Sequence, residues 1–268
     1  LYIYETNIVT NKKMKTSVCA AAASIIVGIA SSCSGQFSSF TVEKEQSLAL
    51  AEGRQDSLTV RIDIEYPECG TNKEAIKAIS ENITSVLLDV QYIEMSPESA
   101  TEKYIEKKAA EYRENNLPLL EIISEDNSST AVLSWEDCAT GHFTGEYEGV
   151  VSYRASKYTY TGGAHGMTVE TCLNFDIKTG ALVKESDIFS DGYESIVSGL
   201  LTKHLPEAFE NNEELNMLFQ REISPNGNFS VSEKGITYTF NQYEIGPYAL
   251  GIIEVTIPWN EIDNIIKK

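Results

Sequence analysis

Basic residues are scarce in this sequence. Lys and Arg number 21 against 40 Asp and Glu, which gives a formal net charge of −19 at pH 7. A chain this acidic is repelled by nucleic acid and by an anionic membrane surface, so we expect no nucleic-acid partner. The sign of the charge favours a basic protein or a cation as the partner.

Sequence motifs that carry enzyme or metal chemistry are also missing. The five cysteines form no CxxC pair and the three histidines form no HExxH motif, which leaves a zinc site with little support. A GxSxG elbow and an EF-hand loop are absent as well, which removes the usual anchors of serine-hydrolase and calcium chemistry. We therefore expect no metal and no cofactor. Cys69, Cys138 and Cys172 lie in the expected folded region, where one pair could form a disulfide.

Long hydrophobic runs are missing too, since a transmembrane helix needs about 20 apolar residues. The apolar run Ser17 to Ile29 is shorter; it follows Met14 and ends in small residues before Cys33. This arrangement is typical of a lipoprotein signal peptide, after whose cleavage Cys33 becomes the lipid-modified N-terminus. We interpret residues 1–13 as a misplaced start and residues 1–32 as removed. The predicted location is the cell envelope, with the lipid anchor as the only membrane contact, and in a two-membrane bacterium the outer membrane facing the periplasm.

Periodic patterns of apolar residues divide the rest of the chain. Residues 33–56 are polar with little periodicity and are predicted to be a flexible tether. Residues 57–160 and 161–268 each combine strand-like alternation with helical stripes, which predicts an N-terminal and a C-terminal α+β region. The expected fold class is α+β, with antiparallel β-sheets and helices packed on one face. The clearest expected elements are strands at 58–66, 169–177 and 251–258, a hairpin at 229–240, and helices at 71–90, 96–115 and 193–205.

The stretch Tyr158–Gly166, YTYTGGAHG, stands between two alternating segments. Gly162 and Gly163 can adopt positive φ without a steric penalty, which predicts a turn. The alternative is that they present backbone N–H groups to an anion, as in a nest. His165 follows them and is the candidate general base or metal ligand; the alternative is a turn-end histidine bonded to neighbouring backbone.

Three motifs together resemble a known family. They are YTGGAHG at Tyr160–Gly166, FDIKTG at Phe175–Gly180 and YEIGPYALG at Tyr243–Gly251. In order and spacing they are similar to the envelope domain family that includes the extracellular domain of RsiV-type, lysozyme-sensing anti-sigma factors and the N-terminal, non-catalytic region of PdaC-type peptidoglycan deacetylases. The resemblance implies an α+β envelope domain with a ligand-sensing role. It does not carry over the deacetylase activity, because the motif-bearing catalytic domain is not in this sequence.

The candidate ligand-binding residues come from two of these motifs: Tyr160, Gly162, Gly163, His165, Tyr243 and Tyr248. Tyrosines beside a Gly-Pro loop can form a platform for a glycan or a peptide, or can be packing residues that clamp an irregular segment. The leading hypothesis is a lipid-anchored binding or sensing module for a lysozyme-like protein or a peptidoglycan fragment. The alternatives are an envelope glycan hydrolase or deacetylase-like enzyme that uses His165, and a structural lipoprotein.

Overall fold

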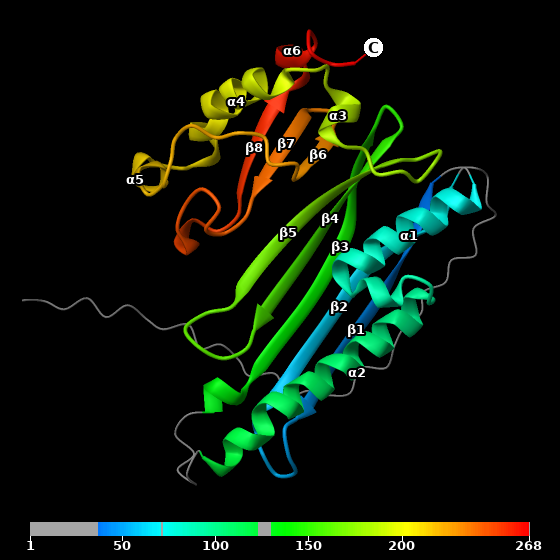
Figure 1. Ribbon diagram of the computed structural model, residues 1–268, viewed down its shortest axis with the longest axis vertical. Coiled ribbons are helices and arrows are strands. Elements are labelled where there is room, and N and C mark those ends of the chain that lie inside the picture. The colour runs from blue at the N-terminus through cyan, green and yellow to red at the C-terminus, as the bar shows by residue number, and fades with distance from the viewer. Residues whose placement is uncertain (1–36, 71, 123–129, 268) are drawn as a thin grey trace, which may run out of the picture.

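Two sheets form the frame of an elongated molecule, of which the computed structural model describes residues 37–70, 72–122 and 130–267 (Figure 1). The long first sheet has five strands in the order β1-β2-β3-β4-β5: β1 at Ser38–Ala49, β2 at Ser57–Cys69, β3 at Trp135–Tyr147, β4 at Val150–Tyr160 and β5 at Met167–Asp176. The second sheet has three, in the order β6-β7-β8: Phe229–Ser232, Gly235–Phe240 and Ile253–Pro258.

Helices cover both sheets. The longer ones are α1 at Lys73–Leu87 and α2 at Pro97–Asn116, which pack on the first sheet, and α4 at Tyr193–His204, which packs on the second. The shorter ones are α3 at Glu185–Ile188, α5 at Asn212–Asn216 and α6 at Trp259–Ile262, with 3₁₀ turns η1 at Val90–Tyr92, η2 at Leu117–Glu121, η3 at Thr130–Leu133, η4 at Leu205–Ala208 and η5 at Tyr248–Leu250. The expected α+β class is confirmed. One pair differs from the expected antiparallel pattern, because β2 and β3 are parallel and are joined through α1 and α2.

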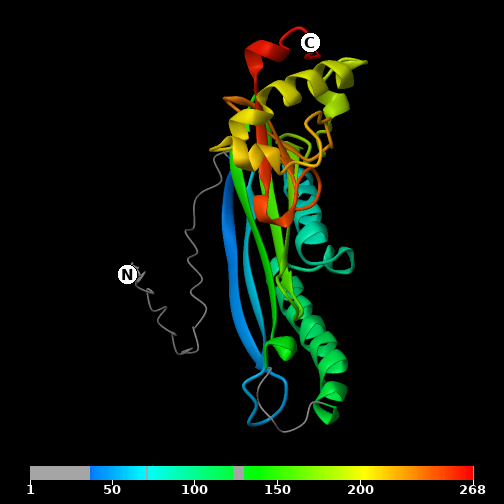
Figure 2. The same cartoon turned by 90° about the vertical axis from the view of Figure 1, so that its left-hand side faces the viewer.

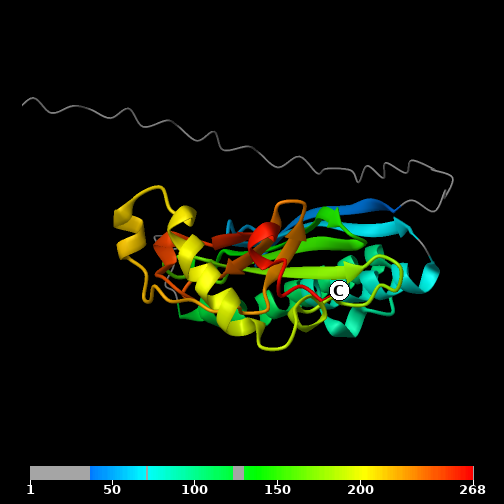
Figure 3. The same ribbon diagram turned by 90° about the horizontal axis from the view of Figure 1, so that it is seen from above.

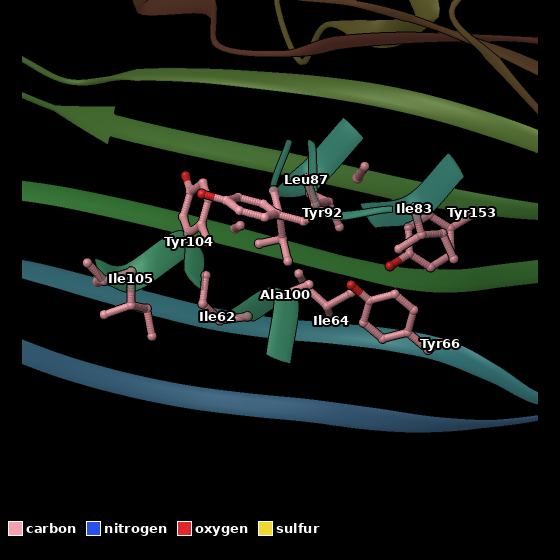
Figure 4. Packing of buried hydrophobic residues seen from close by; sticks show 14 of the residues in the cluster. Ile62, Ile64, Tyr66, Ile83, Leu87, Tyr92, Ala100, Tyr104, Ile105 and Tyr153 are labelled. Atoms are coloured by element: carbon pink, nitrogen blue, oxygen red, sulfur yellow. The ribbon is translucent and has the colours of Figure 1, made fainter. Parts of the chain in front are cut away.

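The face of the first sheet that carries α1 and α2 is buried because apolar residues occupy every second position of β2. Figure 2 shows the two helices on one side of the sheet seen edge-on. In the core between them, strand residues meet helix residues, as Figure 4 shows for Ile62, Ile64, Tyr66, Ile83, Leu87, Ala100 and Tyr104. Two buried tyrosine hydroxyls find partners there: Tyr104 donates to Asp137 at 2.5 Å, and Tyr112 donates to the Leu133 carbonyl at 2.7 Å. The buried hydroxyl of Tyr153 has no hydrogen-bond partner among the described residues.

Strand β1 lies inside the region expected to be a tether. It pairs antiparallel with β2 along its whole length, from Ser38 opposite Cys69 to Ala49 opposite Ser57. The side chains of Phe40, Val42 and Leu48 pack against the first core, so one face of this edge strand is apolar. Lys44 and Gln46 stand at the same parity as these apolar residues, and they hide the alternation in the sequence. The tether prediction is therefore wrong for residues 38–49.

The second sheet lies on the opposite face of the first, at its β5 side and away from β1 (Figure 3). Its own apolar side chains turn away from the first sheet and form a second core with α4 and α6; among them are Ile236, Tyr238, Phe240, Val255 and Ile257. Residues of the other parity, such as Thr239, face β4 and β5. Because β5 pairs with β4, the first sheet continues across the boundary expected between residues 160 and 161.

Polar side chains, rather than an apolar core, join the two sheets at β6. The free edge of β6 presents backbone groups toward β4 and β5. Ser152 Oγ lies 2.9 Å from both Val231 N and Val231 O, and 2.7 Å from Asn174 Oδ1. Asn174 Oδ1 also accepts from Val231 N at 3.2 Å, and Asn174 Nδ2 donates to Phe229 O at 2.8 Å. Both side chains are buried, so these bonds have no competition from water.

Side-chain amides also cap the free edge of β5. Asn228 Oδ1 accepts from Cys172 N at 2.7 Å, and Asn241 Oδ1 accepts from Glu170 N at 2.7 Å. Gln242 Oε1 accepts from Thr168 N at 3.1 Å. We call Ser152, Asn174, Asn228, Asn241 and Gln242 the polar seam. It satisfies backbone groups that an exposed edge strand would leave open to pairing with another chain.

A surface ion pair gives the first half a dependence on acidic pH. Asp89 caps η1, and Lys107 of α2 donates to it at 2.8 Å. The bond from Lys107 is the main reason that the pKa of Asp89 is lowered to about 2. Stability from this pair is present above the ordinary pKa of about 4 and is lost as the pH falls toward about 2.

We expect Asp89→Asn to lower the free energy of unfolding by about 1 kcal/mol at pH 6, because the pair is partly solvent-exposed. The difference from the parent chain should shrink to near zero at pH 2. Urea unfolding of both chains from pH 2 to pH 7 measures it. A difference that stays constant over this range would contradict the assignment.

Within the part of the chain that the structure describes, no helix is both long enough and apolar enough to cross a membrane. Cys33 and the expected signal peptide lie outside that part. Cys138 and Cys172 are free thiols, so they do not pair with each other.

Candidate functional site

Two loops that are distant in sequence meet at one end of β4 and β5. The first joins β4 to β5 and contains Gly162, Gly163 and His165; the second joins β7 to β8 and contains Tyr243 and Tyr248. The polar seam brings them together, because Asn241 and Gln242 hold the start of the second loop against β5.

The first loop requires glycine at specific positions. Gly162 and Gly163 have φ of 89° and 106°, in the left-handed region that disfavours other residues. A Cβ on Gly162 would lie 2.6 Å from the carbonyl oxygen of Val132, so the loop also packs too closely for any side chain there. Tyr160 donates its hydroxyl to the Gly163 carbonyl at 3.0 Å. The turn predicted from the Gly-Gly pair is thus observed.

The second loop holds a tyrosine in a conformation that disfavours tyrosine. Tyr243 has φ of 67°, and apart from Glu148 it is the one non-glycine residue with positive φ in the described ranges. The turn is closed by Glu244 N donating to Asn241 O at 3.0 Å and by Asn241 N donating to Glu244 Oε2 at 2.7 Å. Left-handed backbone costs such a residue about 1–2 kcal/mol. The strain places the Tyr243 ring on the surface, where its exposed fraction is 47%.

The two loops contribute to one group of rings. The His165 imidazole stacks on the Tyr248 ring with 3.9 Å between centroids and 25° between planes. The Tyr243 ring lies 5.9 Å from that of Tyr248, and the Tyr243 hydroxyl lies 3.5 Å from His165 Nε2. We call His165, Tyr243, Tyr248 and the adjoining Tyr160 the aromatic cluster. His165 and Tyr243 are exposed, whereas Tyr160 and Tyr248 are half-buried.

Beneath the cluster, Tyr158 supports the first loop. A Cβ on Gly166 would come within 2.4 Å of the Tyr158 ring, so a larger residue there would displace the ring. Partial burial raises the pKa of Tyr158, and the charge of Glu136 adds to the rise. The phenol therefore stays neutral at physiological pH and contributes an apolar surface.

A polar hollow of about 370 Å³ runs beside β5 next to the second loop, lined in part by Glu170, Asn228, Asn241 and Glu244. Burial raises the pKa of Glu170, while the guanidinium of Arg154 acts against the rise. Arg154 also pairs with Glu254 of β8, so it links the two sheets through two carboxylates. Much of the polar lining of the hollow is thus already paired with other groups of the protein.

The surroundings of His165 suit binding better than proton transfer. Its Nδ1 lies 2.9 Å from the Gly166 carbonyl oxygen, and its Nε2 has the Tyr243 hydroxyl as its neighbour. Carboxylate partners are instead found at His204, whose two ring nitrogens lie 3.0 Å from Glu207 and 3.1 Å from Glu261. His204 is buried where α4 meets α6, which is a structural position.

Metal binding has no support in the described part of the chain. Cys138 and His142 do stand at a CxxxH spacing on β3, and His142 lies 3.8 Å from Asp63. Even so, among the described residues no group of three or more His, Cys, Asp or Glu could hold a metal ion.

The structure therefore places the candidate residues from the sequence together on one surface: Tyr160, Gly162, Gly163, His165, Tyr243 and Tyr248. The residues that position them were not predicted from the sequence. Asn228, Asn241 and Gln242 carry no motif, and only their polarity near strand ends could have marked them.

Two family models match separate parts of the chain. Residues 54–168 match the family model described as Deacetylase PdaC, and residues 186–260 match the one described as Protein of unknown function (DUF3298). The resemblance drawn from the motifs is confirmed to this extent. The matches indicate an uncharacterised, envelope-type domain. A comparison with curated proteins gave no match.

Two solved structures share the fold. A member of the DUF3298 family from Bacteroides fragilis is 24% identical and has a TM-score of 0.79; the match covers 88% of this chain and 96% of that chain. A DUF3298 family protein from Pseudomonas aeruginosa is 16% identical, with a TM-score of 0.59 and coverage of 88% and 97%. At these identities the similarity concerns the fold alone.

Proposed function

We propose that this chain is the folded part of a lipid-anchored cell-envelope protein that binds a basic protein of the lysozyme type through the aromatic cluster. The observation that carries the proposal is the convergence of His165, Tyr243 and Tyr248 on one exposed surface. The strained backbone at Tyr243 supports it, because packing alone does not require this residue to be exposed.

An exposed cluster of this kind has the composition of a protein-binding hot spot. Tyrosine is enriched where binding energy is concentrated, since its ring buries a large area while losing few rotamers. The cluster is also pre-organised, because ring stacking and the polar seam already fix both loops. Little conformational entropy remains to be lost on binding.

Charge distinguishes between the two partners that the family resemblance suggests. A peptidoglycan fragment offers sugar faces for stacking, but the carboxylates of its stem peptides meet a chain of net charge −19. A basic protein gains from that charge in its rate of association. The electrostatics therefore favour the lysozyme-like partner over the cell-wall fragment.

The enzymatic alternative is less well supported by the same geometry. A glycan hydrolase or deacetylase-like mechanism at His165 needs a carboxylate or a metal beside the imidazole. The neighbours of His165 are instead the Tyr248 ring, the Tyr243 hydroxyl and a backbone carbonyl. A purely structural lipoprotein would have no need of the strained, exposed Tyr243.

The lipid anchor at Cys33 is part of the proposal and follows from the signal-peptide pattern before it. The location that goes with it is the envelope, facing the periplasm in a two-membrane bacterium. Mass spectrometry of the N-terminal residue of the mature protein tests the anchor. An unmodified Cys33, or a chain that begins elsewhere, would rule it out.

The soluble chain from Ser34 to Lys268 is expected to bind hen egg-white lysozyme, and to bind it about tenfold more tightly at 20 mM than at 150 mM salt. The charge of the chain is largely exposed, so added salt screens it. Titration calorimetry at the two salt concentrations measures the effect, with an acidic protein of similar size as the control. Absence of binding even at 20 mM salt would contradict the lysozyme proposal.

A further inference from the structure

A second pocket lies far from the aromatic cluster, where the β3–β4 hairpin meets the C-terminal helix. Its volume is about 380 Å³. Eleven residues of β4 separate its end of the first sheet from the aromatic cluster, a distance of about 35 Å. It shares no lining residue with the cluster.

Stacked rings form one wall of the pocket. Tyr147 and Trp259 are 4.7 Å apart between centroids with 17° between their planes. The Trp259 indole donates to the Ser232 carbonyl at 2.8 Å, which fixes its orientation. Half of the remaining lining is aliphatic and includes Val150 and Ile188, which pack against the second core. A rigid apolar wall of this kind suits the stem of a small organic ligand.

The charged side chains that line the pocket are mostly carboxylates. Glu148, Asp187 and Asp263 are acidic, whereas Lys267 is the single basic residue of the lining. The Lys267 amino group already donates to the Ser186 carbonyl at 2.5 Å. Asp187 accepts from the Lys184 backbone at 2.8 Å as part of a helix cap. The side chains of Glu148 and Asp263 are exposed and make no hydrogen bond or ion pair with another described residue.

Glu148 stands in the two-residue turn between β3 and β4. Glu148 has φ of 50° and Gly149 has φ of 82°, so the hairpin turn has left-handed residues at both central positions. Asn-Gly is the favoured pair in such a turn. Glutamate is strained there, and its side chain lines the rim of the aromatic pocket.

We propose that this pocket binds a cationic group on a short aliphatic stem, an alkylammonium or alkylguanidinium. The stem would lie on the apolar wall, and the cation would lie against Glu148 and Asp263 with the rings of Tyr147 and Trp259 beside it. An anion is repelled by the three carboxylates, and a neutral ligand gains nothing from them. The inference goes beyond the proposed function, because it does not involve the aromatic cluster.

Three probes with five carbon atoms each test the proposal on the whole soluble chain: n-pentylamine, n-pentanol and n-pentanoate. We expect n-pentylamine to bind with a dissociation constant on the order of 1 mM, as suits a ligand of so few atoms. The alcohol should bind at least tenfold more weakly and pentanoate not measurably. Titration calorimetry, together with the fluorescence of the two tryptophans, measures all three.

Variants assign the binding to the pocket. Glu148→Asn combined with Asp263→Asn removes two charges, and asparagine suits the left-handed turn, so the fold is retained. This chain should bind n-pentylamine at least tenfold more weakly, whereas Glu114→Gln, at the far end of α2, should leave binding unchanged.

The proposal is overturned if the amine and the alcohol bind equally, if the double variant binds the amine like the parent chain, or if the amine does not bind at 10 mM. None of these results depends on Tyr243 or His165. Failure here therefore leaves the lysozyme proposal standing, and failure of lysozyme binding leaves this one standing.

Discussion

Replacing Asn174 with alanine is expected to lower the free energy of unfolding by about 2–4 kcal/mol. Asn174 is 2% exposed and makes three hydrogen bonds, of which two, to Phe229 and Val231, cross the gap between the two sheets and one joins it to Ser152 of β4. Its loss leaves the Phe229 carbonyl without this buried donor and deprives Ser152 and Val231 of an acceptor. Water cannot readily replace these bonds because the site is closed on both sides.

Urea unfolding followed by circular dichroism measures the effect. The matched control is Asn115→Ala: Asn115 also donates to a carbonyl, that of Glu111 at 2.7 Å, but it does so on the exposed surface of α2. We expect the control to change stability by less than about 0.5 kcal/mol. Equal effects of the two substitutions would mean that the buried seam contributes no more than a surface bond.

The seam also predicts how the molecule unfolds. Two separate hydrophobic cores, one under α1 and α2 and one under α4, are joined mainly by polar contacts. If the seam is weakened, the second core has less to hold it to the first, so Asn174→Ala should broaden the transition or split it into two steps. A single sharp transition at lower urea would show that the cores remain coupled by other contacts.

Much of this fold follows from short-range patterns. The alternation in β2 and the helical stripes of α1, α2 and α4 each bury one face, and such patterns can be recognised without knowledge of the partner. Strand β1 is different, because its apolar residues Phe40, Val42 and Leu48 are separated by charged and polar ones and its stability comes from pairing with β2. An edge strand of this kind resembles a polar linker until its neighbour is known.

The same limit applies to the site. The Gly-Gly turn and the tyrosines of the second loop are visible in the sequence, but their meeting depends on Asn241 and Gln242 capping β5. Nothing local marks an asparagine as the partner of a strand edge some seventy residues earlier. The strain at Tyr243 is likewise invisible in the sequence, since tyrosine is not a residue expected at positive φ.

Because the backbone at Tyr243 is strained, two variants that lose the same ring, and hence the same binding contacts, are expected to differ in stability. Tyr243→Ala and Tyr243→Gly both remove the ring from the aromatic cluster, so each is expected to weaken lysozyme binding by at least 30-fold, the effect of a hot-spot residue of about 2 kcal/mol. Only glycine relieves the positive φ of 67°. We therefore expect the glycine variant to be more stable than the alanine variant by about 1 kcal/mol.

Glu148→Gly is the control for this pair. It relieves the other positive φ, that of 50°, at the opposite end of β4, and should leave lysozyme binding within about twofold of the parent chain. Titration calorimetry and urea unfolding of the three variants give both quantities. Binding that survives in Tyr243→Ala would remove the aromatic cluster as the anchor. Equal stability of the alanine and glycine variants would instead remove the strain argument, because the backbone would then hold the left-handed turn at no cost and the exposure of Tyr243 would need no functional reason.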